Sequence, residues 1–348
     1  MKKLRVGVVG VGHLGRHHAR ILAGMPGVAL VGVSDSSAAR CAEIAALCGV
    51  PAYEDYRALI TRVDAASIVV PTSVHFDVAT AFLNAGKSLL VEKPLTADPT
   101  QASQLVELAE RREAILQVGH IERFNPVLRA LPYPGHSPRL IEGRRVGPYS
   151  FRSCDISVVF DLMIHDLDIV LSLVGQMPES VQARAWSVFG GHEDVACAQL
   201  LFPCGAQAQL VASRAAVHPS RIMTCWWTDA MAELDFASQK TISSVPTRAF
   251  SQAGNRLLNP PPAMVPRLRD SLRGHYFEIT ERDWSGGPEL LAVELEHFVN
   301  CVRERRDPLV NGRRARDAVM VAATIERAAR DQSIQSIPLP DRPSTLAA

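Results

Sequence analysis

Residues 4–15 read LRVGVVGVGHLG and carry the strongest structural signal in the chain. The first six form a short valine-rich run, which is typical of a buried strand in a parallel sheet. Three glycines follow in the spacing G-x-G-x-x-G: the first permits a tight turn, the second lets a phosphate approach the backbone, and the third lets a helix pack on the strand. The stretch therefore predicts a dinucleotide-binding turn, with ligand contacts from Gly10, Gly12, His13, Leu14 and Gly15.

An acidic residue supports this interpretation. Asp35 ends the second predicted strand, 20 residues after Gly15, where a carboxylate accepts hydrogen bonds from the adenosine ribose and repels a 2′-phosphate. Two serines follow it directly, and the first arginine after it is Arg40. The pattern favours NAD over NADP as the cofactor.

The first third of the chain alternates between short apolar runs and helical patterns. We expect strands at 4–9, 28–34, 66–70, 88–92 and 114–118, and helices at 13–23, 36–47, 75–85 and 99–113. Such alternation predicts an α/β fold with an N-terminal doubly wound parallel sheet, a Rossmann domain over residues 1–120.

The pattern changes after residue 120. One amphipathic helix at 161–173 precedes strand-like stretches from 180 to about 250, with a hairpin turn at Pro203-Cys204-Gly205. Strands without intervening helices predict a mainly antiparallel sheet in an α+β domain over 121–348. Helices are expected at 289–306 and 314–329 and a loose tail from Ser333, whereas 251–288 gives no clear pattern.

Composition excludes several classes of protein. The 348 residues include 37 basic and 36 acidic side chains, a net charge of +1, so there is no global attraction to nucleic acid or to an anionic membrane. With 47% hydrophobic and 21% charged residues, a mainly disordered chain is excluded. No membrane anchor is apparent.

The seven cysteines are scattered and never spaced as C-x-x-C, which predicts reduced core residues in a cytoplasmic protein. No metal site is expected. His13, His17 and His18 lack cysteine or carboxylate partners at ligand spacing, and we interpret them as a polar face of the first predicted helix.

Candidate catalytic groups occur at two places. Glu92-Lys93-Pro94 ends a predicted strand, and ligands of open α/β sheets bind at the carboxyl ends of strands. Further along, helical spacing places Asp161, His165, Asp168 and Ser172 on one face. Histidine suits a base that takes a hydroxyl proton, Asp161 would orient it, and Lys93 would hydrogen-bond the reacting oxygen. The alternatives are a surface lysine and an exposed i,i+4 pair.

Taken together, Gly10–Gly15, Asp35, Glu92-Lys93-Pro94 and Asp161-x-x-x-His165 resemble the Gfo/Idh/MocA oxidoreductase family in order and approximate spacing. The resemblance implies NAD(P)-dependent oxidation of a sugar or cyclitol hydroxyl, with Lys93, Asp161 and His165 at the reaction. It also implies a C-terminal domain with a large open antiparallel sheet, often used to form homo-oligomers such as dimers or tetramers. Further cofactor contacts implied by it are Pro71, Thr72, His75, Glu92 and Lys93.

Residues 119–126 and 161–168 further resemble the branch of that family that oxidises nucleotide sugars such as UDP-N-acetylglucosamine at C3. Residues 122–152 hold six arginines and two acids, a local charge of +4 that suits a diphosphate. The expected substrate contacts are Arg123, Asn125, Arg152, Asp161 and His165. Three alternatives stay open: arginines paired with distant carboxylates, a free sugar, inositol or glycoside substrate, and a non-catalytic NAD-binding regulator.

Overall fold

A computed structural model describes residues 3–151, 155–257, 260–331 and 334–336. Contacts between residues divide the chain into two units. The first contains Met1–Phe124, Ser153–Asp168 and Pro288–Ala323, and the second contains Asn125–Arg152, Ile169–Gly287 and Thr324–Ala348.

A six-stranded parallel sheet forms the centre of the first unit, in the order β3-β2-β1-β4-β5-β6. Its strands are β1 Leu4–Val9, β2 Val28–Ser34, β3 Ala52–Tyr53, β4 Ala65–Ile68, β5 Ser88–Glu92 and β6 Leu116–Gly119. Three of them have the predicted bounds. Strand β3 was not predicted, because two residues are too few to show a periodicity. The expected doubly wound α/β architecture is confirmed.

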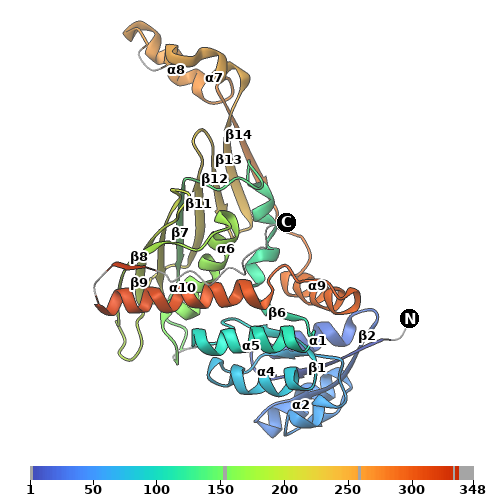
Figure 1. Ribbon diagram of the computed structural model, residues 1–348. Helices are drawn as coiled ribbons and strands as arrows, with labels where there is room; N and C mark the ends of the chain where they lie inside the picture. The colour runs from blue at the N-terminus through green and yellow to red at the C-terminus, as the bar shows by residue number, and fades with distance from the viewer. Residues whose placement is uncertain (1–2, 152–154, 258–259, 332–333, 337–348) are drawn as a thin grey trace, which may run out of the picture. The chain divides into compact units, whose positions relative to one another are not determined.

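Helices cover both faces of this sheet (Figure 1). They are α1 Gly15–Gly24, α2 Ala38–Cys48, α3 Arg57–Ile60, α4 His75–Asn84, α5 Pro99–Arg111, α9 Leu290–Glu304 and the first part of α10 Gly312–Asp331. On one face, α1, α2 and α9 share a core with the sheet, in which Val6, Leu22 and Phe298 are fully buried. Helix α4 packs against α5 and β5.

The second unit contains a nine-stranded sheet within the part of the chain that the structure describes, in the order β14-β13-β12-β11-β7-β10-β9-β8-β15. Its strands are β7 Leu140–Val146, β8 Ser180–Trp186, β9 Val195–Leu201, β10 Gln207–Ser213, β11 Ser220–Trp226, β12 Met231–Asp235, β13 Lys240–Pro246, β14 Phe277–Asp283 and β15 Ile334–Ser336. Pairing is antiparallel except between β7 and β10, which are parallel. The expected antiparallel sheet and the hairpin between β9 and β10 are confirmed, and Gly205 in the turn has a φ of +81°.

Two regions differ from the sequence analysis. Residues 251–288 contain the end of α7 Arg248–Ala253, a short helix α8 Val265–Leu272, 3₁₀ turns and β14. Figure 1 shows α7 and α8 beyond the ends of β13 and β14, and all their residues are half-buried or exposed, so no apolar stripe marks them. The prediction of a loose tail is wrong for residues 334–336, because they pair with β8, while 337–348 lie outside the described residues.

The six cysteines in the described part of the chain are free, and Cys41, Cys225 and Cys301 are buried as expected. Cys204 is exposed in the β9–β10 turn and is not a core residue. Among the residues described, no helix combines the length and apolar character needed to cross a membrane.

Candidate active site

The glycine loop between β1 and α1 has the geometry that its spacing predicts. Gly10 has a φ of +85°, and a Cβ there would collide with the carbonyl oxygen of Val69. A Cβ on Gly15 would collide with the carbonyl oxygen of Gly10, so α1 packs directly against the loop. A Cβ on Gly12, in contrast, would meet no described atom within 4 Å. The loop therefore leaves open space at the position where a pyrophosphate needs to approach the backbone.

Asp35 is fixed against this loop. Its carboxylate accepts hydrogen bonds from the backbone N–H groups of Val11 and Ser37, both at 2.8 Å. Arg40 donates from Nη2 at 2.6 Å and from Nε at 3.2 Å. Burial raises the pKa of Asp35, but the hydrogen bonds from Arg40, Ser37 and Val11 outweigh it and bring the pKa below its ordinary value. The carboxylate is thus ionised, and it lies against the glycine loop, as the prediction of a ribose contact requires.

The residues expected to follow the fourth strand lie in and beside a 3₁₀ turn, Thr72–Val74, which Pro71 precedes. His75 begins α4 and is only 1% exposed. Its Nδ1 lies 2.9 Å from the carbonyl oxygen of Pro94 and its Nε2 lies 2.8 Å from that of Val70. Burial lowers the pKa of His75, so the neutral ring donates one of these contacts. The His75 ring therefore lies between the segment after β4 and the segment after β5 that carries Lys93.

Lys93 is not the surface lysine of the alternative interpretation. Its side chain is 19% exposed, and its Nζ donates to the backbone oxygen of Asp161 at 2.7 Å and to Oδ1 at 3.2 Å. Asp161 lies in a π-helical turn, Val159–Met163, which leads into α6 Ile164–Val174. A π turn interrupts the regular helical hydrogen bonds, and such turns are frequent at functional sites. The carbonyl oxygen that accepts from Lys93 thus belongs to this irregular turn.

His165 follows this turn and contacts a second imidazole. The ring centroids of His165 and His120 lie 6.2 Å apart with the ring planes at 84°. Strands β5 and β6 pair Glu92 with Gly119, so Lys93 and His120 are the next residues at the carboxyl ends of neighbouring strands. The carboxyl ends of the parallel strands therefore bring together four ionisable residues, Lys93, His120, Asp161 and His165. We call them the Lys93–His165 cluster.

His120 was not singled out as a site residue in the sequence analysis. One signal was available: His120 follows a buried strand directly, as Lys93 does. Asp168 was expected on the same helix face as His165, but its side chain is only 2% exposed and pairs with Arg123 at 3.4 Å. Both residues lie in α6, three positions apart and after the π turn, so they keep a shared face; they differ in burial, because Asp168 is enclosed with Arg123 while His165 is half-buried.

A buried polar layer adjoins the cluster. His18 is fully buried, with Nδ1 2.8 Å from Ser67 Oγ and Nε2 3.2 Å from Glu92 Oε1, so its assignment to a polar helix face is wrong. A Cβ on Gly119 would lie 2.7 Å from Glu92 Oε1, so any larger residue there would displace the Glu92 carboxylate. Glu294 of α9 is fully buried, and burial together with the charges of Glu92 and Asp168 raises its pKa well above the ordinary value.

The residues expected to contact the substrate do not all belong to one unit of the structure. The Arg123 side chain is 9% exposed and is bound by Asp168, as the alternative of paired arginines requires. Asn125 belongs to the second unit, where its Nδ2 donates to the carbonyl oxygen of Phe236 at 3.2 Å and its Oδ1 accepts from Val127 N at 3.3 Å. Arg152 lies outside the described residues.

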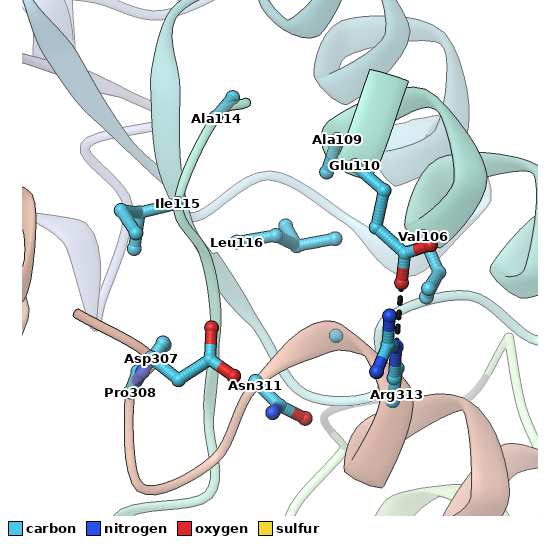
Figure 2. A pocket seen from close by; sticks show the side chains of 11 residues that line it. Val106, Ala109, Glu110, Ala114, Ile115, Leu116, Asp307, Pro308, Asn311 and Arg313 are labelled. Carbon is cyan, nitrogen blue, oxygen red and sulfur yellow. Dashed lines mark hydrogen bonds and ion pairs between the residues drawn. The ribbon is translucent and has the colours of Figure 1, made fainter. Parts of the chain in front are cut away.

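The first unit also has a surface hollow, which lies at the amino end of β6, away from the Lys93–His165 cluster. Figure 2 shows its lining from α5, from Ala114–Leu116 at the start of β6, and from residues 307–313, with Arg313 Nε donating to Glu110 Oε1 at 2.6 Å. It contains none of the residues expected at the active site. The residues expected to take part in the reaction thus lie at the carboxyl ends of the parallel strands, where ligands of such folds bind.

A glycine loop, an ionised carboxylate fixed against it and ionisable groups at the carboxyl ends of one parallel sheet are the features of a dinucleotide-dependent oxidoreductase. Residues 4–120 match the model of an oxidoreductase family with an NAD-binding Rossmann fold, and residues 150–232 match the GFO/IDH/MocA C-terminal domain. The chain belongs to the Gfo/Idh/MocA family, and it is an NAD-binding oxidoreductase that acts on CH–OH groups.

Relatives support this assignment along most of the chain. The UDP-N-acetylglucosamine 3-dehydrogenase of Acidithiobacillus ferrooxidans is 37% identical over 96% of this chain and 100% of its own. The NAD⁺-dependent scyllo-inositol 2-dehydrogenase of Bacillus subtilis is 26% identical over 88% of this chain and 89% of its own.

Solved structures agree. A crystal structure of the A. ferrooxidans enzyme superimposes with a TM-score of 0.82 at 35% identity, covering 95% of this chain and 99% of that one. A levoglucosan dehydrogenase in complex with NADH and levoglucosan gives a TM-score of 0.81 at 16% identity over 97% of this chain and 100% of its own, and shares the fold.

Proposed function

We propose that this protein oxidises a ring hydroxyl of UDP-N-acetylglucosamine, at C3, to a ketone with NAD as the cofactor. Two lines support the substrate: the 37% identity to a UDP-N-acetylglucosamine 3-dehydrogenase over nearly the full length of both chains, and a sequence resemblance centred on residues 119–126 and 161–168. The observation that carries the reaction is the Lys93–His165 cluster at the carboxyl edge of the NAD-binding sheet.

Each side chain has a distinct role in this proposal. His165 takes the proton of the substrate hydroxyl, because imidazole is the side chain whose ordinary pKa lies nearest to neutrality. Lys93 donates a hydrogen bond to the same oxygen and offsets the negative charge that develops there. Asp161 holds the Lys93 ammonium through both its backbone and its carboxylate oxygens. Bound NAD supplies the hydride acceptor.

The protein is further proposed to be a cytoplasmic homo-oligomer, a dimer or a tetramer, with an NAD-binding domain over residues 1–120 and a substrate and oligomerisation domain over 121–348. The free cysteines support a reducing compartment. The near-zero net charge supports a small-molecule substrate over a nucleic acid or a membrane surface.

Incubation of the purified protein with NAD and single sugars tests the substrate. We expect absorbance of the reduced nicotinamide with UDP-N-acetylglucosamine, and a product lighter by two hydrogen atoms in mass spectrometry. The panel includes UDP-glucose, free N-acetylglucosamine and myo-inositol. Turnover of an unphosphorylated sugar or inositol without turnover of any UDP-sugar would contradict the nucleotide-sugar assignment, and NAD binding without turnover of any member would favour a regulator.

A further inference from the structure

His120 is an imidazole whose hydrogen-bonding capacity is unused. It is 1% exposed, and neither Nδ1 nor Nε2 has a hydrogen-bond partner among the residues that the structure describes. Buried polar atoms are normally paired, because an unpaired one loses its bonds to water without replacement. A phenyl ring would fill the same space without this loss, so packing alone gives no reason for a histidine.

The surroundings of His120 are those of a reactive centre. Its ring contacts the ring of His165, at a centroid distance of 6.2 Å, and it is the register neighbour of Lys93 across β5 and β6. Charges from four residues act on it: Asp168 and Glu92 are negative, and Lys93 and Arg123 are positive. Burial is the largest influence and lowers the pKa of His120, so its ring is neutral and offers one N–H and one lone pair.

A second imidazole can stabilise the protonated form of His165, which the Lys93 ammonium disfavours. A histidine that takes a proton beside the Lys93 ammonium becomes a cation next to a cation, which lowers its basicity. A neutral ring with a free lone pair offsets this repulsion by accepting a hydrogen bond from the charged form.

We propose that His120 is a positioning residue for His165, accepting a hydrogen bond from the imidazolium that forms when His165 takes the substrate proton. This inference rests on the proposed function of His165. Two imidazoles joined by a direct N–H···N bond have centroids about 1 Å closer than in the resting arrangement. A small movement of either ring therefore completes the contact, and His120 holds it without changing its own charge.

The test replaces His120 with phenylalanine, which keeps a ring but removes both nitrogens, and with glutamine, which keeps an acceptor. In the NAD-bound protein, labelled at histidine Cε1, we expect the pKa of His165 to fall by about half a unit or more in His120→Phe and to recover in part in His120→Gln. His165→Ala assigns the resonance. In turnover, His120→Phe should lower kcat about tenfold and move the acidic limb of the pH profile to lower pH, because a less basic His165 stays unprotonated in more acid solution.

His297→Phe is the matched control, since His297 lies on α9, accepts a hydrogen bond from Leu309 N at 2.9 Å and is not part of the cluster. It should leave the His165 titration and kcat unchanged. An unaltered His165 pKa in both His120 variants, with an unaltered acidic limb, would overturn the proposal. The titration needs no sugar, so absence of turnover in the wild type would refute the proposed function and leave this inference to be decided by the titration.

Discussion

The ammonium nitrogen of Lys93 lies 2.7 Å from the backbone oxygen of Asp161 and 3.2 Å from its carboxylate, although the two residues are 68 positions apart in the chain. The contact joins the end of a strand of the NAD-binding sheet to a π-helical turn. It is formed with a backbone atom as well as a side chain, so the path of the chain at 159–163 itself contributes to the position of the lysine. Changes in either partner should therefore affect catalysis more than folding.

Lys93→Met should lower kcat/KM about 10²-fold or more while NADH still binds, because the ammonium is lost from the reacting oxygen and not from the glycine loop. Steady-state rates with UDP-N-acetylglucosamine and NADH binding by fluorescence measure the two effects. Lys87→Met is the control at the other end of the same strand, and its rate should match the wild type. Equal rates in both variants would contradict a catalytic role for Lys93.

Replacement of Gly12 by alanine should impair NADH binding, whereas replacement of Gly15 should impair stability. A Cβ at Gly12 meets no described atom within 4 Å, so Gly12→Ala should melt near the wild-type temperature but bind NADH at least about tenfold more weakly, because the methyl group takes the place of the pyrophosphate. A Cβ at Gly15 collides with the carbonyl oxygen of Gly10, so Gly15→Ala should lower the melting temperature. Unimpaired NADH binding by Gly12→Ala would show that the pyrophosphate lies elsewhere.

The parts of the fold that the sequence predicts well are those fixed by local patterns. Strands β1, β2 and β5 have their predicted bounds because each is a short apolar run between turn residues. Strand β7 escaped prediction because Gly143 and Arg145 occupy inward positions, with the Arg145 guanidinium 5.8 Å from the centre of the Phe236 ring. An inward arginine breaks the apolar alternation by which a strand is identified.

The candidate site likewise contains residues that local sequence patterns predict and residues that they do not. Residue types and spacing predicted the glycine loop, Asp35 and the candidates Lys93, Asp161 and His165. The π turn escaped prediction because its apolar residues also fit a regular helix. The burial of Asp168 depends on its ion pair with Arg123, 45 positions away in the chain. The pairing of Lys93 with Asp161 and the burial of His18 and His120 depend on contacts between distant segments, which no local pattern records.

Cofactor choice should depend on Arg40 as well as on Asp35. The Arg40 guanidinium binds the Asp35 carboxylate at 2.6 Å, so removal of the acid frees a cation beside the position of the ribose. Asp35→Ala should therefore bind NADPH more tightly than the wild type, because repulsion of the 2′-phosphate is lost and Arg40 becomes available to it. Fluorescence titration with NADH and NADPH measures the change.

Asp35→Ala combined with Arg40→Ala separates the two contributions. The double variant should lose most of the gain in NADPH affinity, and Arg40→Ala alone should keep the preference for NADH. If the double variant binds NADPH as tightly as Asp35→Ala does, Arg40 does not contact the phosphate, and the gain comes from the loss of repulsion alone.

Glu294 should make stability depend on pH. Its folded pKa is raised by burial and by Glu92 and Asp168, whereas in the unfolded chain it ionises near its ordinary value. The folded state then holds a proton that the unfolded state releases, so the free energy of unfolding falls as pH rises above about 4.3, by up to about 1.4 kcal/mol per pH unit until the folded carboxyl ionises. Glu294→Gln keeps the shape and removes the ionisation. Its melting temperature should therefore exceed that of the wild type by a margin that widens from pH 5 to pH 8.

Glu296→Gln is the matched control for this effect, because Glu296 is an exposed residue of the same helix. The melting temperature of Glu296→Gln should match that of the wild type at every pH. A Glu294→Gln margin that stays constant between pH 5 and pH 8 would mean that the two states ionise alike, and Glu294 would then be charged in the folded protein. That outcome would require a cation or a donor close to its carboxylate, since an unpaired charge is too costly to keep in a fully buried position.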